Sequence, residues 1–340
     1  MIETTTSPGR WDDWCREVGL GDVYYDLRYL EIWETWEGGE AVGIRFVDAL
    51  GTVLYPLLRR PLDALAGGAG AVDVRTAYDF GGPLAFGERP AELLAAFDDA
   101  WTQEARRWGV VSEFCRLHPF RCRRRPPAAS FHADNYVLEL SGSRDEVLAR
   151  LHRSHLRDLR RARRGPLRAR VERSPSPARV DAFAALYGET MERRGSDPFY
   201  RFPRRLLERL LGLDEVSLVA VDDAQGPVAM ALFLASGREL FYFLSASSPR
   251  AAHHTPGALL HDEARRFALA QRCEHIHYGG GGEGVRRFKS RLADSKVPYY
   301  VVRRVHDPAT YARLVSANRC EHETVFPAYQ GLLAARRPGA

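Results

Sequence analysis

Alternating apolar and polar residues mark short strands in the first half of the chain, and segments with helical spacing lie between them. Residues 41–47 and 52–58 alternate in this way and are joined by a short link that contains glycine, which predicts a hairpin. The other elements expected in this half are helices at 28–36 and 90–108 and strands at 110–117 and 135–140.

The second half repeats this order of elements. The elements expected there are helices at 177–194, 203–211, 256–272 and from 308, and strands at 216–221, 228–234, 240–245, 274–278 and 299–305. The sequence therefore predicts an α/β (α+β) fold with two copies of one small domain. We expect a first domain over residues 1–140, completed by residues 306–340, and a second over residues 141–305.

Between the two halves, Ser143 and Glu146 have the spacing of a capping box and predict the start of a long helix that ends at Gly165. Residues 150–173 hold ten arginines and two acidic residues, a local net charge of +8, whereas the whole chain carries +5. A stripe of one sign on one helix face favours a polyanion ligand, although such a stripe can also be an ordinary solvated face. The candidate contacts for such a ligand are Arg153, Arg157, Arg160, Arg161 and Arg164.

Length and composition exclude several classes of protein. A chain of 340 residues exceeds the usual size of a single core, and 45% hydrophobic and 27% charged residues are typical of a globular protein. We expect no membrane span and no signal segment, because no apolar run approaches about 20 residues and the N-terminus lacks a basic and apolar region. Five scattered cysteines fit reduced thiols. These features predict a cytoplasmic protein, which we expect to be a monomer.

Three histidine-containing pairs have the residue types of metal ligands. They are His253 with His254, His275 with His277, and Cys320 with His322. None has a third ligand at a suitable spacing, and His275 and His277 simply alternate on a strand, so no metal is expected.

Four consecutive glycines, residues 279–282, follow a predicted strand and precede a basic helix. Glycines let backbone N–H groups approach a ligand closely, and a helix start favours an anion. Lys289 lies in that helix and is one of only two lysines among 49 Lys+Arg, the other being Lys296. A lysine kept in such an arginine-rich chain indicates a need for a compact charge, although a surface lysine present by chance is the alternative.

Four stretches, taken in order, resemble the Fem transferases, which have a double GNAT-like domain. They are residues 78–84, an aromatic-Gly-Gly-Pro turn; residues 113–119, with Phe-x-Arg-Leu-His-Pro; the basic helix; and residues 279–282 with Phe288 and Lys289. The resemblance covers residues 24–305 and is to shorter members without the coiled-coil arm. It implies two tandem GNAT-like domains, each a mixed, mainly antiparallel sheet flanked by helices. It also implies transfer of an aminoacyl group from charged tRNA to an amine, in cell-wall precursor or natural-product synthesis.

The resemblance also implies roles for individual residues. Lys289 would stabilise the oxyanion or contact the terminal adenosine of the tRNA, and Phe288 would stack beside that terminus. Asp79 would accept a proton from the attacking amine, or is only a turn residue. Arg116 and His118 would orient the acceptor, or cap a strand end. The expected substrate contacts are Tyr78, Arg116, His118, Tyr242, Tyr278, Gly280 and Gly281.

The donor remains open between two chemistries. Acyl-CoA-dependent GNAT domains hold the pyrophosphate with a glycine-containing loop before a helix, whereas this chain has His253 and Pro256 in the corresponding loop, and proline lacks an N–H. The arginine stripe suits a nucleic-acid backbone. We therefore expect aminoacyl-tRNA as co-substrate and no bound cofactor. An acyl-CoA N-acyltransferase is the first alternative and a non-catalytic RNA-binding protein the second.

Overall fold

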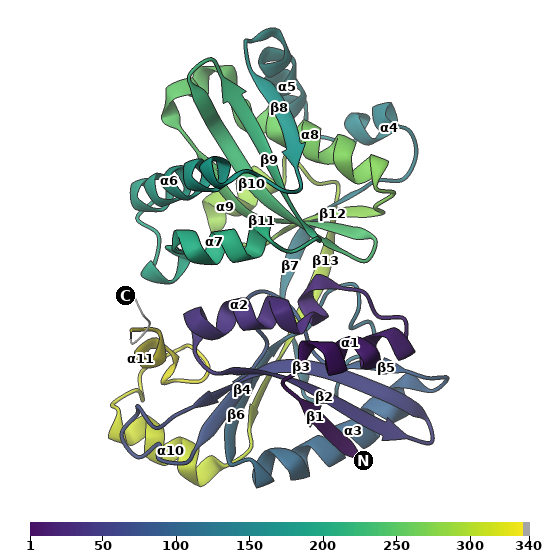
Figure 1. The fold of residues 1–340 in the computed structure, drawn as a ribbon, viewed down its shortest axis with the longest axis vertical. Coiled ribbons are helices and arrows are strands. Elements are labelled where there is room, and N and C mark those ends of the chain that lie inside the picture. The colour runs from purple at the N-terminus through teal and green to yellow at the C-terminus, as the bar shows by residue number, and fades with distance from the viewer. Residues whose placement is uncertain (336–340) are drawn as a thin grey trace. The chain divides into compact units, whose positions relative to one another are not determined.

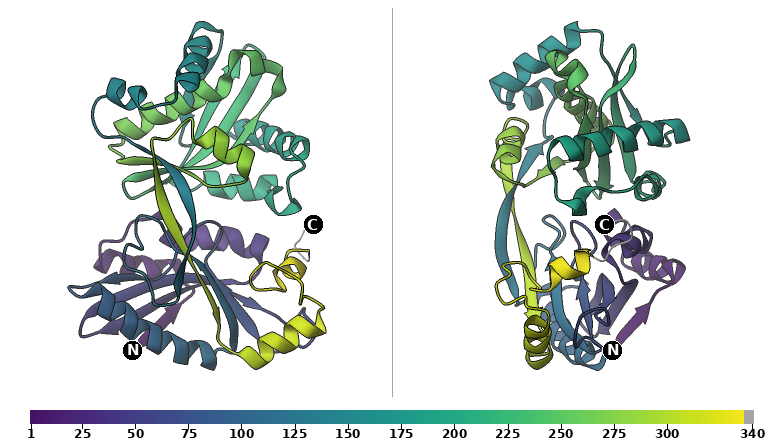
Figure 2. Two further views of the ribbon diagram at one scale, coloured as in Figure 1. Left: turned by 180° about the vertical axis from the view of Figure 1, so that it is seen from behind. Right: turned by 90° about the vertical axis from the view of Figure 1, so that its left-hand side faces the viewer.

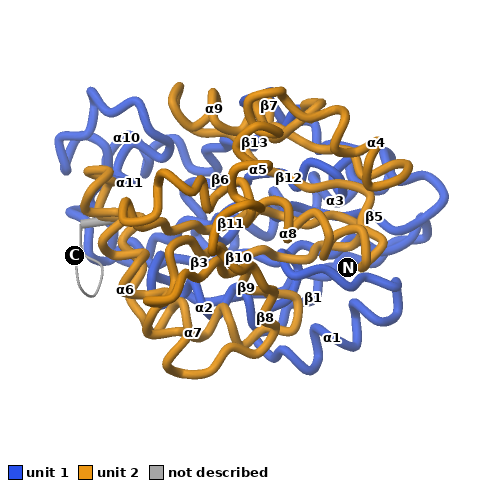
Figure 3. The backbone as a smooth tube through the Cα atoms, turned by 90° about the horizontal axis from the view of Figure 1, so that it is seen from above, with its two compact units in different colours: residues 1–133, 298–340 blue, residues 134–297 orange. Residues whose placement is uncertain are grey.

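The computed structural model describes residues 1–335, which form helices and strands in alternation, with mixed and mainly antiparallel strand pairing. The chain divides into two compact units (Figure 3). Unit 1 comprises residues 1–133 with 298–340, and unit 2 comprises residues 134–297. The two domains expected from the sequence, residues 1–140 with 306–340 and residues 141–305, stay a prediction.

The sheet of unit 1 is antiparallel except where β4 pairs with β6 in parallel. Its strands, in sheet order, are β1 (Ile2–Thr5), β2 (Glu40–Asp48), β3 (Gly51–Pro61), β4 (Val72–Arg75), β6 (Val110–Arg116) and β13 (Ser295–Val305), and β5 (Leu84–Phe86) pairs with β3. The expected hairpin is confirmed: β2 and β3 pair from Glu40 opposite Arg59 to Asp48 opposite Gly51.

Helices cover both faces of this sheet (Figure 1). The helices of unit 1 are α1 (Pro8–Glu17), the 3₁₀ helix η1 (Val23–Tyr25), α2 (Leu27–Glu37), α3 (Pro90–Arg107), α10 (Pro308–Ala317) and α11 (Gln330–Ala335). The Trp11 ring of α1 packs on Gly43, where an added Cβ would lie 2.2 Å from the ring. On the other face, Phe97 and Trp101 of α3 contact Tyr55 of β3.

The sheet of unit 2 contains a meander, as expected from the sequence. Its strands, in sheet order, are β7 (Ala129–Glu139), β12 (His275–Gly279), β11 (Glu239–Ser247), β10 (Gly226–Ser236), β9 (Val216–Asp223) and β8 (Arg168–Glu172). Only β11 and β12 of this series pair in parallel. β7 begins at Ala129 rather than at the expected residue 135, and its first five residues belong to unit 1.

Two groups of helices cover the opposite faces of the unit 2 sheet (Figures 1 and 2). Helices α6 (Pro177–Arg193) and α7 (Arg204–Leu211) lie on one face, and α5 (Arg153–Arg164) and α8 (Pro256–Ala270) lie on the other. The remaining helices are α4 (Arg144–Ala149), η2 (Pro198–Tyr200), η3 (Pro249–His254) and α9 (Glu283–Lys289). Ala264 and Ala268 of α8 pack into a core with Phe233 and Ile276.

The single long helix expected from Ser143 to Gly165 is wrong, because the chain breaks into α4 and α5. The capping box at Ser143 is confirmed, with the Glu146 side chain accepting from the Ser143 N–H at 2.6 Å. His152 then takes an extended conformation and caps α5 through Ser154 N–H. Asp, Asn, Ser and Thr usually supply such a cap, so the sequence pattern did not reveal this second start.

Candidate functional site

The tetraglycine loop joins β12 to α9 and turns the chain back on itself. Gly279 and Gly281 have φ of +72° and +128°, values that side chains other than glycine rarely adopt. At the far end of α9, the Lys289 Nζ donates to the Gly280 carbonyl oxygen at 2.7 Å. The lysine is the last residue of α9, and its charge lies against the loop.

An aromatic group lies next to Lys289 and contains three of the predicted site residues. The His261 ring of α8 is 5.6 Å from Phe288, 5.5 Å from Tyr278 and 4.9 Å from Tyr242, between ring centroids. Tyr278 is buried, whereas Phe288 is 38% exposed. The structure therefore brings Phe288, Tyr242 and Tyr278 together, and Phe288 offers a face to solvent.

His261 is a further candidate site residue, which no sequence pattern indicated. It is 1% exposed, and its Nδ1 has no hydrogen-bond partner among residues 1–335. Burial lowers the pKa of His261 well below its ordinary value, and the charges of His155, Arg265 and Lys289 add to this effect. A neutral imidazole therefore lies beside the Lys289 ammonium. The buried position of His261 on α8 gave no signal in the sequence.

Two buried charged residues, Arg265 and Asp262, lie close to this aromatic group. Arg265 is 2% exposed, and its Nη2 lies 3.4 Å from Asp262 Oδ1 and 3.4 Å from His155 Nε2. Asp262 also forms an ion pair with Arg163, whose Nη2 lies 2.7 Å from Asp262 Oδ2. Burial lowers the pKa of His155 to about 3, with Arg265 and Arg291 acting in the same direction.

A cavity of about 170 Å³ lies between α5, the start of α8 and the end of α9. It is lined by His155, Asp158, Thr255, Gly257, Ala258, Phe288, Arg291 and Leu292. Arg291 is already paired, because its Nη2 lies 2.5 Å from Asp158 Oδ2 and its Nε donates to Ser154. Phe288 links this cavity to the aromatic group, so one side chain belongs to both.

The arginines predicted on α5 are exposed to solvent. These are Arg153, Arg157, Arg160, Arg161 and Arg164. None of them has a side-chain hydrogen bond or ion pair among residues 1–335. The acidic residue of the helix, Asp158, pairs with Arg291 instead, so the stripe keeps its full charge.

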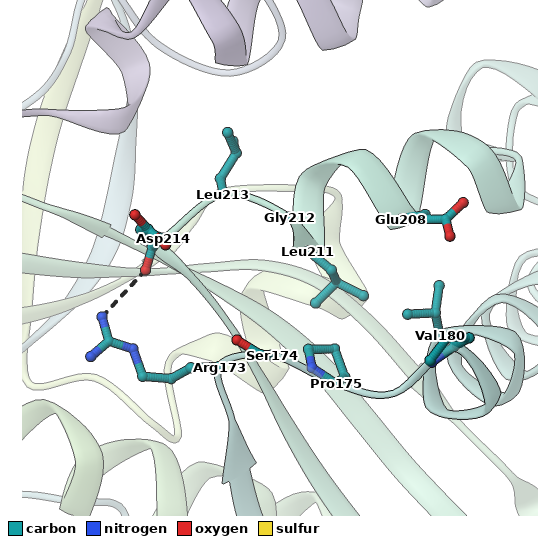
Figure 4. A pocket seen from close by; sticks show the side chains of 10 residues that line it. Arg173, Ser174, Pro175, Val180, Glu208, Leu211, Gly212, Leu213 and Asp214 are labelled. Carbon is teal, nitrogen blue, oxygen red and sulfur yellow. Dashed lines mark hydrogen bonds between the residues drawn. The ribbon is translucent and has the colours of Figure 1, made fainter.

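A second cavity, of about 240 Å³, lies between the end of β8, the start of α6 and the end of α7 (Figure 4). Arg173 lies along it and donates to the Asp214 carbonyl oxygen at 3.3 Å. This cavity contains none of the predicted site residues.

His118 in unit 1 has the geometry of a structural cap. It is fully buried, and its Nδ1 accepts the backbone N–H groups of Phe120 and Arg121, each at 3.2 Å. Burial, followed by the charge of Arg121, holds the pKa of His118 well below its ordinary value. The structural alternative left open for this residue therefore fits its surroundings.

Tyr78 and Asp79 lie at the turn that follows β4. Asp79 has φ of +76°, an uncommon value for aspartate that marks backbone strain, and strained residues gather at functional sites. Its Oδ2 accepts from the Tyr24 hydroxyl at 3.4 Å. The Tyr78 ring stacks on Trp33 with centroids 4.6 Å apart. Arg116, on β6, lies over Phe114. The roles predicted for these residues stay predictions.

Within residues 1–335, one trio of side chains has donor atoms close enough to hold a metal ion: Glu239, Glu274 and His275. Arg238 lies 2.5 Å from Glu274 and competes for that carboxylate. The trio lies at the start of β11 and β12 and includes no predicted site residue.

Comparisons with known proteins define the fold. Residues 149–290 match the family model described as an acetyltransferase (GNAT) domain. The crystal structure of FemX matches with a TM-score of 0.64 and 12% identity, over 87% of this chain and 96% of that one. L-PGS from Bacillus licheniformis matches with a TM-score of 0.55 and 11% identity, over 92% and 96% of the two chains. No curated protein sequence matches this chain.

The chain is therefore a GNAT-fold protein with the tandem architecture of these structures, and the predicted fold class is confirmed. A third structure agrees: the C-terminal domain of a putative lysylphosphatidylglycerol synthetase from Agrobacterium fabrum matches with a TM-score of 0.52 and 13% identity, over 92% and 96% of the chains. The matched GNAT domain, which contains the Gly-rich loop and Lys289, is of the acyltransferase type. No helix within residues 1–335 combines the length and apolar character needed to cross a membrane.

Substitution of Gly281 tests whether the conformation of the tetraglycine loop determines the local stability of α9. In Gly281→Ala, the new Cβ would lie 2.9 Å from Val285 at a φ of +128°, so strain of roughly 1–3 kcal/mol is expected. Amide hydrogen exchange in α9 should accelerate by about tenfold or more. Gly282→Ala is the control, because Gly282 has φ of −64° and no atom within 4 Å of an added Cβ. Equal exchange in the two variants would contradict control by Gly281.

The buried state of His155 predicts a pH-dependent stability. Its folded pKa of about 3 lies below the unfolded value near 6.5, so the unfolded state binds more protons as pH falls below 6.5. Between pH 7.5 and 5.5 this histidine should lower the free energy of unfolding by about 1.4 kcal/mol. Urea denaturation of the wild type and of His155→Gln should show this difference in pH dependence. If the free energy of unfolding falls equally in the wild type and in His155→Gln, His155 is not the source of the pH dependence.

Proposed function

We propose that this protein is an aminoacyltransferase that moves an aminoacyl group from charged tRNA to an amine of a small-molecule or peptide acceptor, forming an amide. The observation that supports this most is the unpaired arginine stripe on α5, in the same unit as the Gly-rich loop and Lys289. From Arg153 to Arg164 the helix rises roughly 16 Å, at 1.5 Å per residue. Charge spread over that length suits a nucleic-acid backbone, which proteins hold chiefly through phosphate contacts.

The chemistry requires positioning and charge stabilisation rather than a covalent intermediate. The acceptor amine attacks the ester carbonyl, the new C–N bond forms, and the C–O bond to the tRNA ribose breaks. The amine loses a proton and the ribose hydroxyl gains one. Lys289, held by the Gly280 carbonyl, supplies a fixed positive charge for the oxyanion.

Phe288 and its neighbours would receive the end of the tRNA. The Phe288 ring is 38% exposed at the end of a basic helix, and bases stack on such exposed aromatic rings. Tyr242 and Tyr278 support the ring through His261. The resemblance to Fem transferases implies the same donor, and no bound cofactor is part of this proposal.

The acceptor would be bound with the help of unit 1. Tyr78, Asp79 and Arg116 are our candidates there, and the strained Asp79 is the proposed proton acceptor.

An acyl-CoA N-acyltransferase is the second candidate, and the cavity at the start of α8 favours it. Gly257 and Ala258 line this cavity in the first turn of the helix, and a helix N-terminus favours a pyrophosphate, although the Ala258 N–H already donates to the Thr255 carbonyl oxygen at 3.0 Å. Against it, Pro256 opens the helix without an N–H, Thr255 is left-handed, and Arg291 is already paired. The family model that matches residues 149–290 is described as an acetyltransferase domain, which is in keeping with this candidate.

Donor consumption separates these two candidates. The protein is incubated with a mixed pool of charged tRNA or with acetyl-CoA, together with a set of amines. The proposal predicts amine-dependent loss of an aminoacyl ester and no release of CoA. CoA release with intact esters would establish the second candidate, and tRNA binding without turnover in either assay would indicate an RNA-binding protein.

Lys289 is tested by two substitutions. Lys289→Ala should lower kcat by roughly 10²–10³, the usual cost of removing an oxyanion donor. Lys289→Arg should restore it only in part, because a planar guanidinium does not replace a compact ammonium. Lys296→Ala is the control, since Lys296 is the other lysine of the chain and lies over the Tyr136 ring. Wild-type rates in both Lys289 variants would exclude this role.

The arginine stripe is tested by its salt dependence. Each lost phosphate contact should reduce the slope of log affinity for tRNA against log salt by roughly 0.7–0.9. Arg157→Ala with Arg160→Ala should therefore weaken binding and flatten the slope by about 1.4–1.8. The control removes two other exposed helix arginines with Arg106→Ala and Arg205→Ala. If the two double variants bind tRNA with the same affinity, below that of the wild type, the loss of affinity comes from net charge alone. If neither differs from wild type, the stripe is a solvated face.

A further inference from the structure

Three arginines of unit 1 surround one phenylalanine on a single sheet face. Arg75 of β4 and Arg303 of β13 are the direct cross-strand neighbours of Phe114 on β6. The guanidinium carbons of Arg75, Arg116 and Arg303 lie 5.8, 5.7 and 5.9 Å from the centre of the Phe114 ring. We call Arg75, Arg116, Arg303 and Phe114 the arginine face.

The charge of the arginine face is mostly uncompensated. Glu37 lies 3.1 Å from Arg75 and is the one carboxylate paired with the three arginines within residues 1–335. Arg303 instead lies 3.1 Å from His132 Nδ1. Burial lowers the pKa of His132, and the charges of Arg303 and Arg116 lower it further. The face therefore keeps a net charge of about +2, with a neutral histidine beside it.

Packing on the ring does not account for this arrangement. A cation over an aromatic ring contributes little where it is solvated, and three like charges around one ring repel one another. Repulsion from neighbouring positive charges also acts on Arg75, which is 9% exposed. Burial lowers the pKa of Arg75 to about 10; Glu37 opposes this shift, whereas Arg60 and Arg116 add to it. An anion between the guanidinium groups would relieve this repulsion.

The geometry indicates a small ligand. Each guanidinium carbon lies within 6 Å of one ring centre, so the three charges are gathered around a single side chain, whereas those of α5 follow a helix. Guanidinium groups bind phosphate through paired N–H donors, and several of them together favour a dianion. Phe114 gives an apolar surface for the carbon atoms next to such a group.

We propose that the arginine face binds the phosphate group of a phosphorylated small molecule. Resting on the proposed function, this molecule is the amine acceptor. The phosphate contacts Arg116 and Arg303, which are the more accessible arginines, and Arg75 holds the inner side of the site while paired with Glu37.

Calorimetric titration with inorganic phosphate tests the site without any donor. Arg116→Gln with Arg303→Gln should weaken phosphate binding by at least about tenfold, the cost of losing charged hydrogen bonds. Arg106→Gln with Arg205→Gln removes the same charge elsewhere and should leave binding unchanged. Malonate should bind the wild type at least about tenfold more weakly than phosphate. Equal phosphate affinity in the three proteins, or equal affinity for malonate and phosphate, would overturn the proposal.

Two further measurements keep the result interpretable. Arg116→Lys with Arg303→Lys keeps both charges and should recover part of the phosphate affinity, whereas a variant that is merely misfolded would not be rescued in this way. Phosphoethanolamine should then accelerate loss of the aminoacyl ester more than ethanolamine in the wild type, but not in Arg116→Gln with Arg303→Gln. Ester loss that is equal for the two amines overturns the acceptor assignment. Phosphate binding as expected, with no ester loss from any charged tRNA, supports the site and counts against the proposed function.

Discussion

The contact between the Lys289 ammonium and the Gly280 carbonyl is the constraint on which the rest of the candidate site depends. It joins the last residue of α9 to the middle of the loop that precedes the helix. Helix α9 has no buried residue, so little apolar packing holds it in place. This charge-assisted hydrogen bond and the positive φ angles of Gly279 and Gly281 therefore help to fix both the lysine and the direction of Phe288.

Two kinds of arginine surround the candidate chemistry, and burial and pairing separate them. Arg163, Arg265 and Arg291 are tied to Asp262 or Asp158 and brace the helices around His261. The stripe on α5 and the outer members of the arginine face lack acidic partners among residues 1–335. In a chain with almost no lysine, composition alone cannot tell a bracing arginine from a binding one. The acidic residues make the distinction, because carboxylates pair with the bracing arginines and leave the binding arginines available for a ligand.

Local sequence signals predicted most of the fold, since strong periodicity and caps act over a few residues. The β2–β3 hairpin, α6 and the β9–β11 meander lie within a few residues of their expected bounds. The break at His152 was missed because histidine is an unusual cap. His261 and the arginine face were missed for another reason. Their neighbours come from distant parts of the chain, and only strand register or helix packing brings them together.

The course of β7 and β13 has a consequence for how the protein is made. Each strand has residues in both units, so unit 2 is one continuous segment inserted into unit 1. Strand β13 pairs with β6 and supplies a strand of the unit 1 sheet. During synthesis, every strand of unit 2 emerges from the ribosome before most of β13, so unit 2 can complete its sheet first. Until that last strand arrives, β6 lacks its partner on one side, and its unpaired N–H and C=O groups form an exposed edge that can pair with other chains.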